Sequence, residues 1–185
     1  MKDIVRFSPL PLRLVHTTAC LAMVLTIAVG AVIAHQGHGP ITLDDLTRNA
    51  LAIVEGRVDS VKSAWNPDHT QIRTTVRVLA DAFYKGDNEA SAVEFVLLGG
   101  AVGEDGLAII GQPEFRTGEH VIVFLRASWK TSDVPVVQME HGKFTVETNA
   151  AGAEVLVNSV GARYAKGEAL ASIRLMNAAL TGGRP

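Results

Sequence analysis

Hydrophobic and polar residues alternate over several short stretches in the second and third quarters of the chain, which predicts β-strands separated by turns. The alternation is cleanest over residues 72–78. The unbroken apolar run at 121–125 predicts a strand that is buried on both faces. Further strands are predicted at 53–63 (with a bulge at Gly56), 93–98, 134–140, 143–147 and 154–157.

Helices are predicted only on either side of the strands. Thr42 and Asp45 have the spacing of a capping box and start a short helix over 41–50. Residues 168–180 place their apolar side chains on one face and predict an amphipathic C-terminal helix. The expected fold is therefore mainly β: a small OB-like β-barrel, or a β-sandwich, with a short N-terminal helix and a C-terminal amphipathic helix.

The N-terminal segment has the order of a secretory signal peptide, with basic residues first, then an apolar stretch at 21–33, then small residues. We expect it to cover residues 1–34, with cleavage after Ala34 favoured over cleavage after Gly30. The alternative is an uncleaved anchor over 17–34, which is barely long enough for a bilayer. The body is predicted to be exported, either periplasmic or secreted, and to touch a membrane only through an uncleaved leader.

The remaining chain divides into a polar leader at 35–41, the β-barrel domain at 42–160 and a C-terminal helix and tail at 161–185. The signal peptide at 1–34 holds three of the 17 basic and one of the 19 acidic residues, which leaves 14 basic and 18 acidic residues for the rest of the chain. A mildly acidic body without a basic run argues against nucleic acid as a partner. Removal of the leader also removes Cys20, the only cysteine, so no disulfide or thiol chemistry is expected.

Catalytic patterns are scarce. The glycine cluster at 98–106 is followed by more glycine and proline rather than by a helix, so it does not fit a phosphate-binding loop. Glu119 and His120 together could perform acid–base chemistry at the start of a strand, but such a pair more often lies solvated in a turn. We therefore expect no enzyme, and an uncharacterised hydrolase is the less favoured alternative.

The histidines are the candidate metal ligands. After cleavage at Ala34 the chain would begin with His35, whose amino group and ring could bind copper or zinc together with His38. A further nitrogen would come from His69, His120 or His141. The alternative interpretation is that His35 and His38 belong to a polar leader and bind no metal.

Two tryptophans are candidates for an exposed binding surface. Trp65 and Trp129 both lie beside turns, and with Glu119 and His120 they form the predicted surface. The phenylalanines, in contrast, are expected to pack in the core.

Several motifs resemble a family of small exported bacterial domains. They are LDDL at 43–46, AIVEGRVDSV at 52–61, Trp65, YKG at 84–86, GGAVG at 99–103, GQPEF at 111–115 and GEHVIVFL at 118–125. The first strand is also distantly similar to the OB-like barrel of the netrin and tissue-metalloprotease-inhibitor superfamily. The resemblance implies an exported protein, such as a protease, as a possible partner. Those inhibitors place an N-terminal cysteine on the protease zinc, and this chain has no cysteine there, so their mechanism does not transfer to it. Because no acid, base and nucleophile converge in a recognisable pattern, the expected function is non-catalytic binding, with a protein partner favoured.

Overall fold

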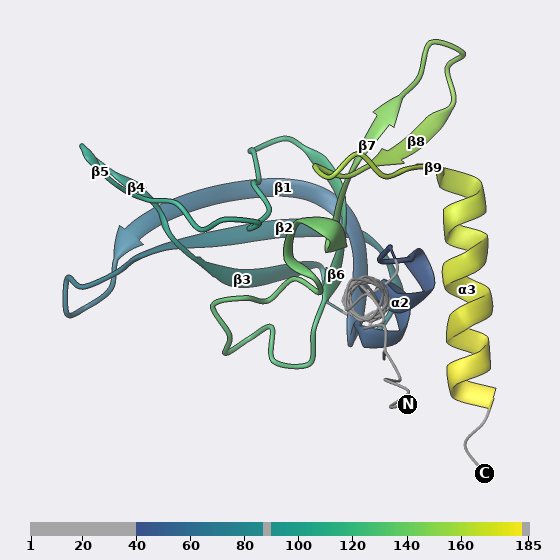
Figure 1. The fold of residues 1–185 in the computed structure, drawn as a ribbon, viewed down its shortest axis with the longest axis horizontal. Helices are drawn as coiled ribbons and strands as arrows, with labels where there is room; N and C mark the ends of the chain where they lie inside the picture. Colours follow the sequence, from purple (N-terminus) through teal and green to yellow (C-terminus); the bar gives the residue numbers. More distant parts are fainter. Residues whose placement is uncertain (1–39, 87–89, 183–185) are drawn as a thin grey trace, which may run out of the picture. The chain divides into compact units, whose positions relative to one another are not determined.

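Antiparallel β-structure dominates the computed structural model, which describes residues 40–86 and 90–182. Seven strands form one sheet in the order β3-β2-β1-β6-β7-β8-β9, and β4 and β5 form a separate hairpin (Figure 1). The strands are β1 (Ala52–Trp65), β2 (Ile72–Lys85), β3 (Ala92–Leu98), β4 (Gly100–Val102), β5 (Asp105–Leu107), β6 (His120–Leu125), β7 (Lys143–Thr148), β8 (Glu154–Val157) and β9 (Arg163–Ala165). The helices are α2 (Leu43–Asn49), the 3₁₀ turn η1 (Met139–Gly142) and α3 (Lys166–Gly182). The prediction of a mainly β fold with a short N-terminal and a C-terminal helix is confirmed.

The sheet does not close on itself in the described residues, because its outer strands β3 and β9 do not pair with each other. Its largest unit is the hairpin of β1 and β2, each 14 residues long, which exceeds the predicted strand lengths. The predicted bulge is confirmed by a shift in register between Glu55 and Gly56. A side chain at Gly56 would overlap the carbonyl oxygen of Leu79, so only glycine allows the backbones of β1 and β2 to approach this closely.

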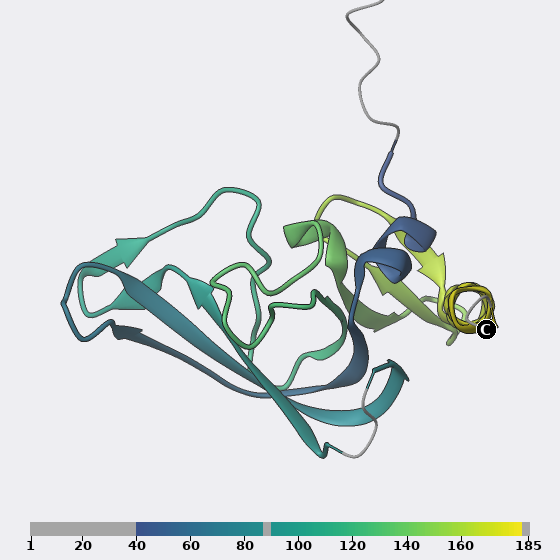
Figure 2. The ribbon, with the colours of Figure 1, turned by 90° about the horizontal axis from the view of Figure 1, so that it is seen from below.

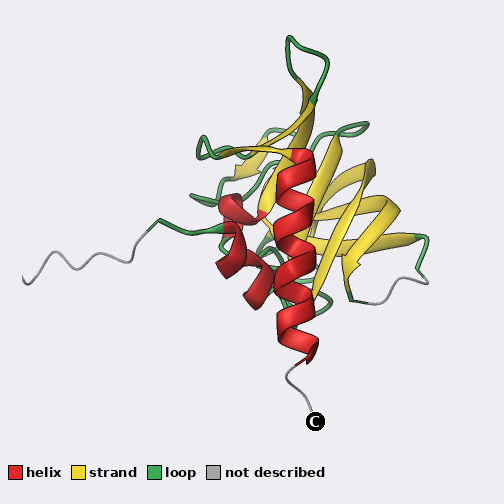
Figure 3. Cartoon of the chain, turned by 90° about the vertical axis from the view of Figure 1, so that its right-hand side faces the viewer, coloured by secondary structure: helices red, strands yellow, loops and turns green. Residues whose placement is uncertain are grey.

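The apolar run at 121–125 forms β6 and is buried on both faces, as predicted. Val121, Val123 and Leu125 pack on one face, in a cluster with β1, β2, β3 and Phe115. Ile122 and Phe124 pack on the other face, in a cluster that includes residues of both α2 and α3. Figure 3 shows the two helices lying together on one side of the sheet. No helix in the described part of the chain is long and apolar enough to cross a membrane.

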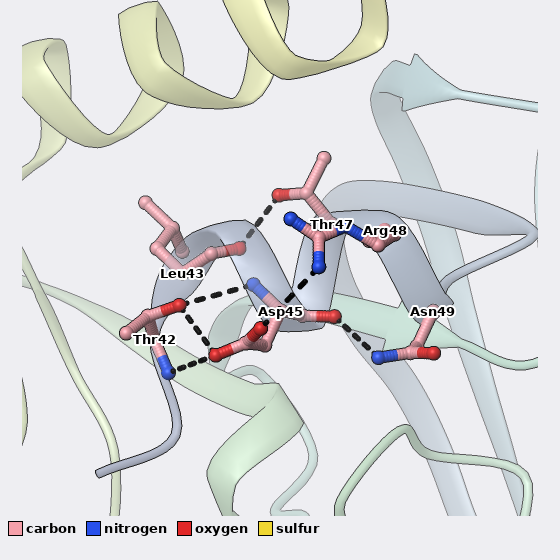
Figure 4. A network of polar contacts seen from close by, with 6 residues as sticks. All are labelled: Thr42, Leu43, Asp45, Thr47, Arg48 and Asn49. Carbon is pink, nitrogen blue, oxygen red and sulfur yellow. Dashed lines mark hydrogen bonds and ion pairs between the residues drawn. The ribbon is translucent and has the colours of Figure 1, made fainter. Parts of the chain in front are cut away.

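Helix α2 begins with the predicted capping box (Figure 4). The Asp45 N–H donates to Thr42 Oγ1 at 3.1 Å, and the Thr42 N–H donates to Asp45 Oδ2 at 3.1 Å. These two bonds satisfy N–H groups that have no partner inside a helix. The hydrogen bonds from the Thr42 hydroxyl and N–H hold the pKa of Asp45 below its usual value. A seven-residue helix is thereby defined at its start by local sequence.

One predicted strand is wrong. Residues 134–140 contribute only a single bridge, between Val136 and Leu125, and then turn into η1. Gln138 and Met139 both have φ near +50°, which no strand accommodates. The turn lets the chain reverse and enter β7.

Two other boundaries differ from the prediction. β2 extends to Lys85, seven residues beyond the alternation at 72–78 from which it was predicted. The sheet also gains β9, which lies directly before α3 and was not predicted.

Candidate functional site

An open trough of about 660 Å³ lies at the turn end of the β1–β2 hairpin. Its floor consists of apolar side chains from the three neighbouring strands and from the segment before β6: Val61, Val76, Leu97 and Phe115. Val76, Leu97 and Phe115 belong to the core cluster and are at most 8% exposed, so the trough reaches the edge of the hydrophobic interior. An apolar wall of this kind favours a ligand that buries hydrophobic surface.

The β4–β5 hairpin forms one wall of the trough and extends beside the turn end of β1 and β2 (Figure 2). It starts at two glycines with positive φ, Gly99 at 97° and Gly100 at 127°. A side chain at Gly100 would overlap the hydroxyls of both Ser63 and Thr74. The two glycines therefore let the chain leave β3 and cross directly over the ends of β1 and β2.

The rim of the trough exposes apolar residues. Leu107, which lines the trough, is 37% exposed, and Ile110, which follows the lining residue Ile109 in the chain, is 98% exposed. Exposed residues of this size are common singly, but here they adjoin an apolar hollow.

Polar groups in the trough mostly satisfy one another. The hydroxyls of Ser63 and Thr74 lie 2.9 Å apart, and Thr74 Oγ1 donates to the Gly99 carbonyl at 2.6 Å. Gln112 Nε2 donates to the Leu98 carbonyl at 2.6 Å, whereas Gln112 Oε1 is buried with no partner in the described residues. In the described residues neither hydroxyl is hydrogen-bonded to a histidine or a carboxylate, so these groups form no nucleophile–base pair there.

A second hollow, of about 350 Å³, shares the ridge at residues 112–116 with the trough and is more polar. In it Glu119 Oε1 accepts a hydrogen bond from Thr145 Oγ1 at 2.6 Å and forms an ion pair with Lys143 Nζ. Burial opposes ionisation of Glu119, but the hydrogen bonds from Lys143 and Thr145 outweigh it and hold its pKa below the usual range. Glu119 is therefore a stable anion with a fixed cation, which suits structure better than proton transfer.

The most extensive polar network surrounds Glu55, a side chain that is only 7% exposed. Lys166 Nζ lies 2.7 Å from Glu55 Oε1, and the Tyr84 hydroxyl donates to Glu55 Oε2. His120 Nε2 lies 2.8 Å from Glu55 Oε1, but outside hydrogen-bonding geometry for the ring N–H, so this is a close polar contact and not a hydrogen bond. Lys166 also pairs with Glu154, at 2.9 Å.

Each pKa in the Glu55 network follows from its partners. Burial opposes ionisation of Glu55, but the hydrogen bonds from Lys166 and Tyr84 outweigh it, and the pKa of Glu55 lies below its usual value. Burial would lower the pKa of Lys166, yet the bonds to Glu55 and Glu154 raise it. Burial and the neighbouring carboxylate raise the pKa of the Tyr84 phenol. None of these residues lines either of the two hollows, and through Lys166 and Glu55 the network joins the start of α3 to β1.

The predicted pair of Glu119 and His120 is separated by the geometry of β6. Glu119 contacts Lys143 and Thr145, whereas His120 contacts Glu55. Adjacent strand residues point to opposite faces, so each side chain has its own partners. The alternative interpretation had both side chains solvated in a turn, whereas they are only 16% and 19% exposed.

The two predicted tryptophans lie in different settings. Trp65 ends β1 and stacks on His69, with ring centroids 6.1 Å apart. Trp129 is half-buried against the core cluster, and Lys130 Nζ lies 5.1 Å from its ring centroid. Neither lines the trough, whose residues carried no catalytic pattern in the sequence. The paired glycines at 99–100 were the one feature of the sequence that could have indicated the β4–β5 wall of the trough.

The predicted metal ligands His35 and His38 lie outside the described residues. Within those residues, no group of three His, Cys, Asp or Glu side chains is arranged to hold a metal ion. Of the histidines proposed to complete the site, His69 contacts Trp65 and His120 contacts Glu55.

Comparison with known protein families, with curated proteins and with solved structures finds no match to this chain. The trough and its lining residues are therefore the basis on which a function can be proposed.

Proposed function

We propose that this chain is an exported, non-catalytic binding domain, and that it holds a segment of a partner protein in the trough at the turn end of the β1–β2 hairpin. The observation that carries the proposal is an open hollow of about 660 Å³ whose lining includes residues of the hydrophobic core. An exported protein such as a protease is the kind of partner that the sequence resemblance implies.

The chemistry of the trough supports binding rather than turnover. Its hydroxyls are bonded to each other and to the backbone, and its floor is apolar. Binding energy would come from burial of apolar side chains against Leu97 and Phe115, at about 25 cal/mol per Å² of apolar surface. A hollow of this size can hold a few side chains of a partner segment, whereas a flat protein surface would not enter it.

The test uses a library of random dodecapeptides displayed on phage. Peptides are selected on the whole protein, purified in the form that its producing cells make. Selected peptides are resynthesised, and their affinity is measured by fluorescence anisotropy. Leu107→Glu and Ala108→Glu place a charge on exposed positions of the trough wall, and each is expected to weaken binding about tenfold. The matched control is Leu175→Glu, on α3, where the leucine is 74% exposed.

The outcomes are distinct. Weakening by the two trough variants with no change in Leu175→Glu supports the proposal. Failure to select any binding peptide, or equal affinity of all three variants and the parent chain, would overturn it. Unchanged urea unfolding of each variant shows that the effects arise at the surface.

A further inference from the structure

The outer edge of β3 carries backbone groups that have no partner in the described residues. The Gly99 N–H donates to the Ile72 carbonyl of the strand before it. In an antiparallel pair every second residue is hydrogen-bonded to the neighbouring strand, so Val93, Phe95 and Leu97 direct their N–H and C=O groups toward β2. The even-numbered residues of β3 therefore point their N–H and C=O groups away from the sheet.

Only one end of this edge is occupied. The Leu98 N–H donates to the Asp133 carbonyl at 3.2 Å, and the Leu98 carbonyl accepts from Gln112 Nε2 at 2.6 Å. Glu94 and Val96 have no such backbone or side-chain partner among the described residues. The opposite edge of the sheet is the three-residue strand β9, so the seven-residue β3 is the longer open edge (Figure 1).

A row of alternating charges leads to this edge. Asp59 Oδ2 lies 3.5 Å from Arg77 Nε on the neighbouring strand, and Arg77 is paired directly with Glu94 of β3. Glu94 is exposed and is the last charge of the row. Because directly opposite residues share a face, the next strand would favour a basic side chain opposite Glu94.

We infer that β3 receives an extended segment of the partner polypeptide, which adds to the sheet as its next strand and places a lysine or arginine opposite Glu94. Backbone hydrogen bonds to Glu94 and Val96 would hold the segment, and its alternate side chains would face the side of Phe95 and Leu97. This inference rests on the proposed binding function and specifies the partner. A second copy fits less well, because β3 itself contains no basic residue to lie opposite Glu94.

The first measurement is amide hydrogen exchange with and without a selected peptide. Strand addition is expected to slow exchange at the amides of Glu94 and Val96. Val96→Pro removes an outward N–H without removing a bond to β2, and it is expected to weaken peptide binding about tenfold. Ala165→Pro is the matched control, because the Ala165 N–H points away from its partner strand at the other edge.

The second measurement is a charge exchange. Glu94→Lys is expected to weaken binding of a peptide with a basic residue about tenfold, and replacing that residue by glutamate in the peptide is expected to restore it. Glu168→Lys, at an exposed position of α3, is the control for net charge.

Each outcome is decisive. If peptides bind and Leu107→Glu weakens them, but the Glu94 and Val96 amides stay unprotected and the charge exchange does not restore affinity, trough binding stands and strand addition is wrong. If no peptide binds, the proposed function fails and the strand addition with it. A dimer in native mass spectrometry that Val96→Pro dissociates would show that the edge binds a second copy, and would overturn the partner proposed.

Discussion

Replacement of Lys166 by methionine tests how strongly the network around Glu55 holds the C-terminal helix to the sheet. The change keeps the apolar stem but removes the cation that lies 2.7 Å from Glu55 Oε1. Glu55, 7% exposed, would keep its contacts with Tyr84 and His120 but lose its principal counter-charge. Breaking a buried pair costs about 3–5 kcal/mol, and the 16% exposure of Lys166 reduces our expectation to about 2 kcal/mol.

The assay is urea unfolding at pH 7, followed by circular dichroism, with thermal unfolding as a second measure. A loss of about 2 kcal/mol corresponds to a midpoint roughly 4–8 °C lower for a domain of this size. Arg163→Met is the matched control. It breaks the Arg163–Glu147 pair, 3.4 Å apart, whose side chains are 59% and 47% exposed, and it is expected to cost less than about 0.5 kcal/mol.

The effect of Lys166→Met should also depend on pH. The folded-state pKa of Glu55 is lowered, so its contribution is present above the ordinary value of 4.5 and is lost as the pH falls through the folded-state pKa. As the pH falls from 7 to below 4.5, the difference between the parent chain and Lys166→Met should therefore narrow. A loss no greater than that of Arg163→Met, or a difference that stays constant with pH, would refute this account of the network.

Three further predictions concern the trough wall, the first helix and the leader. Gly100→Ala would force a side chain into Ser63 and Thr74 and is expected to cost about 1–3 kcal/mol in urea unfolding, whereas Gly106→Ala, with no atom nearer than 3.9 Å, should cost less than about 0.5 kcal/mol. Thr42→Ala removes the cap of α2 and is expected to cost about 1 kcal/mol, which Thr42→Ser should largely recover; equal losses would contradict the capping role. Intact mass spectrometry of the exported fraction is expected to find a chain that begins at His35, and a full-length mass there would contradict cleavage.

Local rules predicted much of the β-structure. The alternation over 72–78 and the apolar run at 121–125 were correct because burial on one or both faces leaves a direct trace in the order of residues. The capping box of α2 and the bulge at Gly56 were correct because each depends on residues only a few positions apart or on one close backbone approach. The strand predicted at 134–140 was wrong because left-handed backbone at Gln138 and Met139 is set by the reversal into β7, not by local preference.

The sequence by itself determined the class of fold, its flanking helices and the positions of most strands, since these follow from the spacing of apolar residues. Only the tertiary structure decided which side chains meet. Glu55 and Lys166 are more than a hundred positions apart and form a buried ion pair, while the neighbours Glu119 and His120 are directed to different partners. The trough and the open edge of β3 likewise depend on strand pairing between distant segments, and pairing at long range is fixed by packing of the whole sheet rather than by any local pattern.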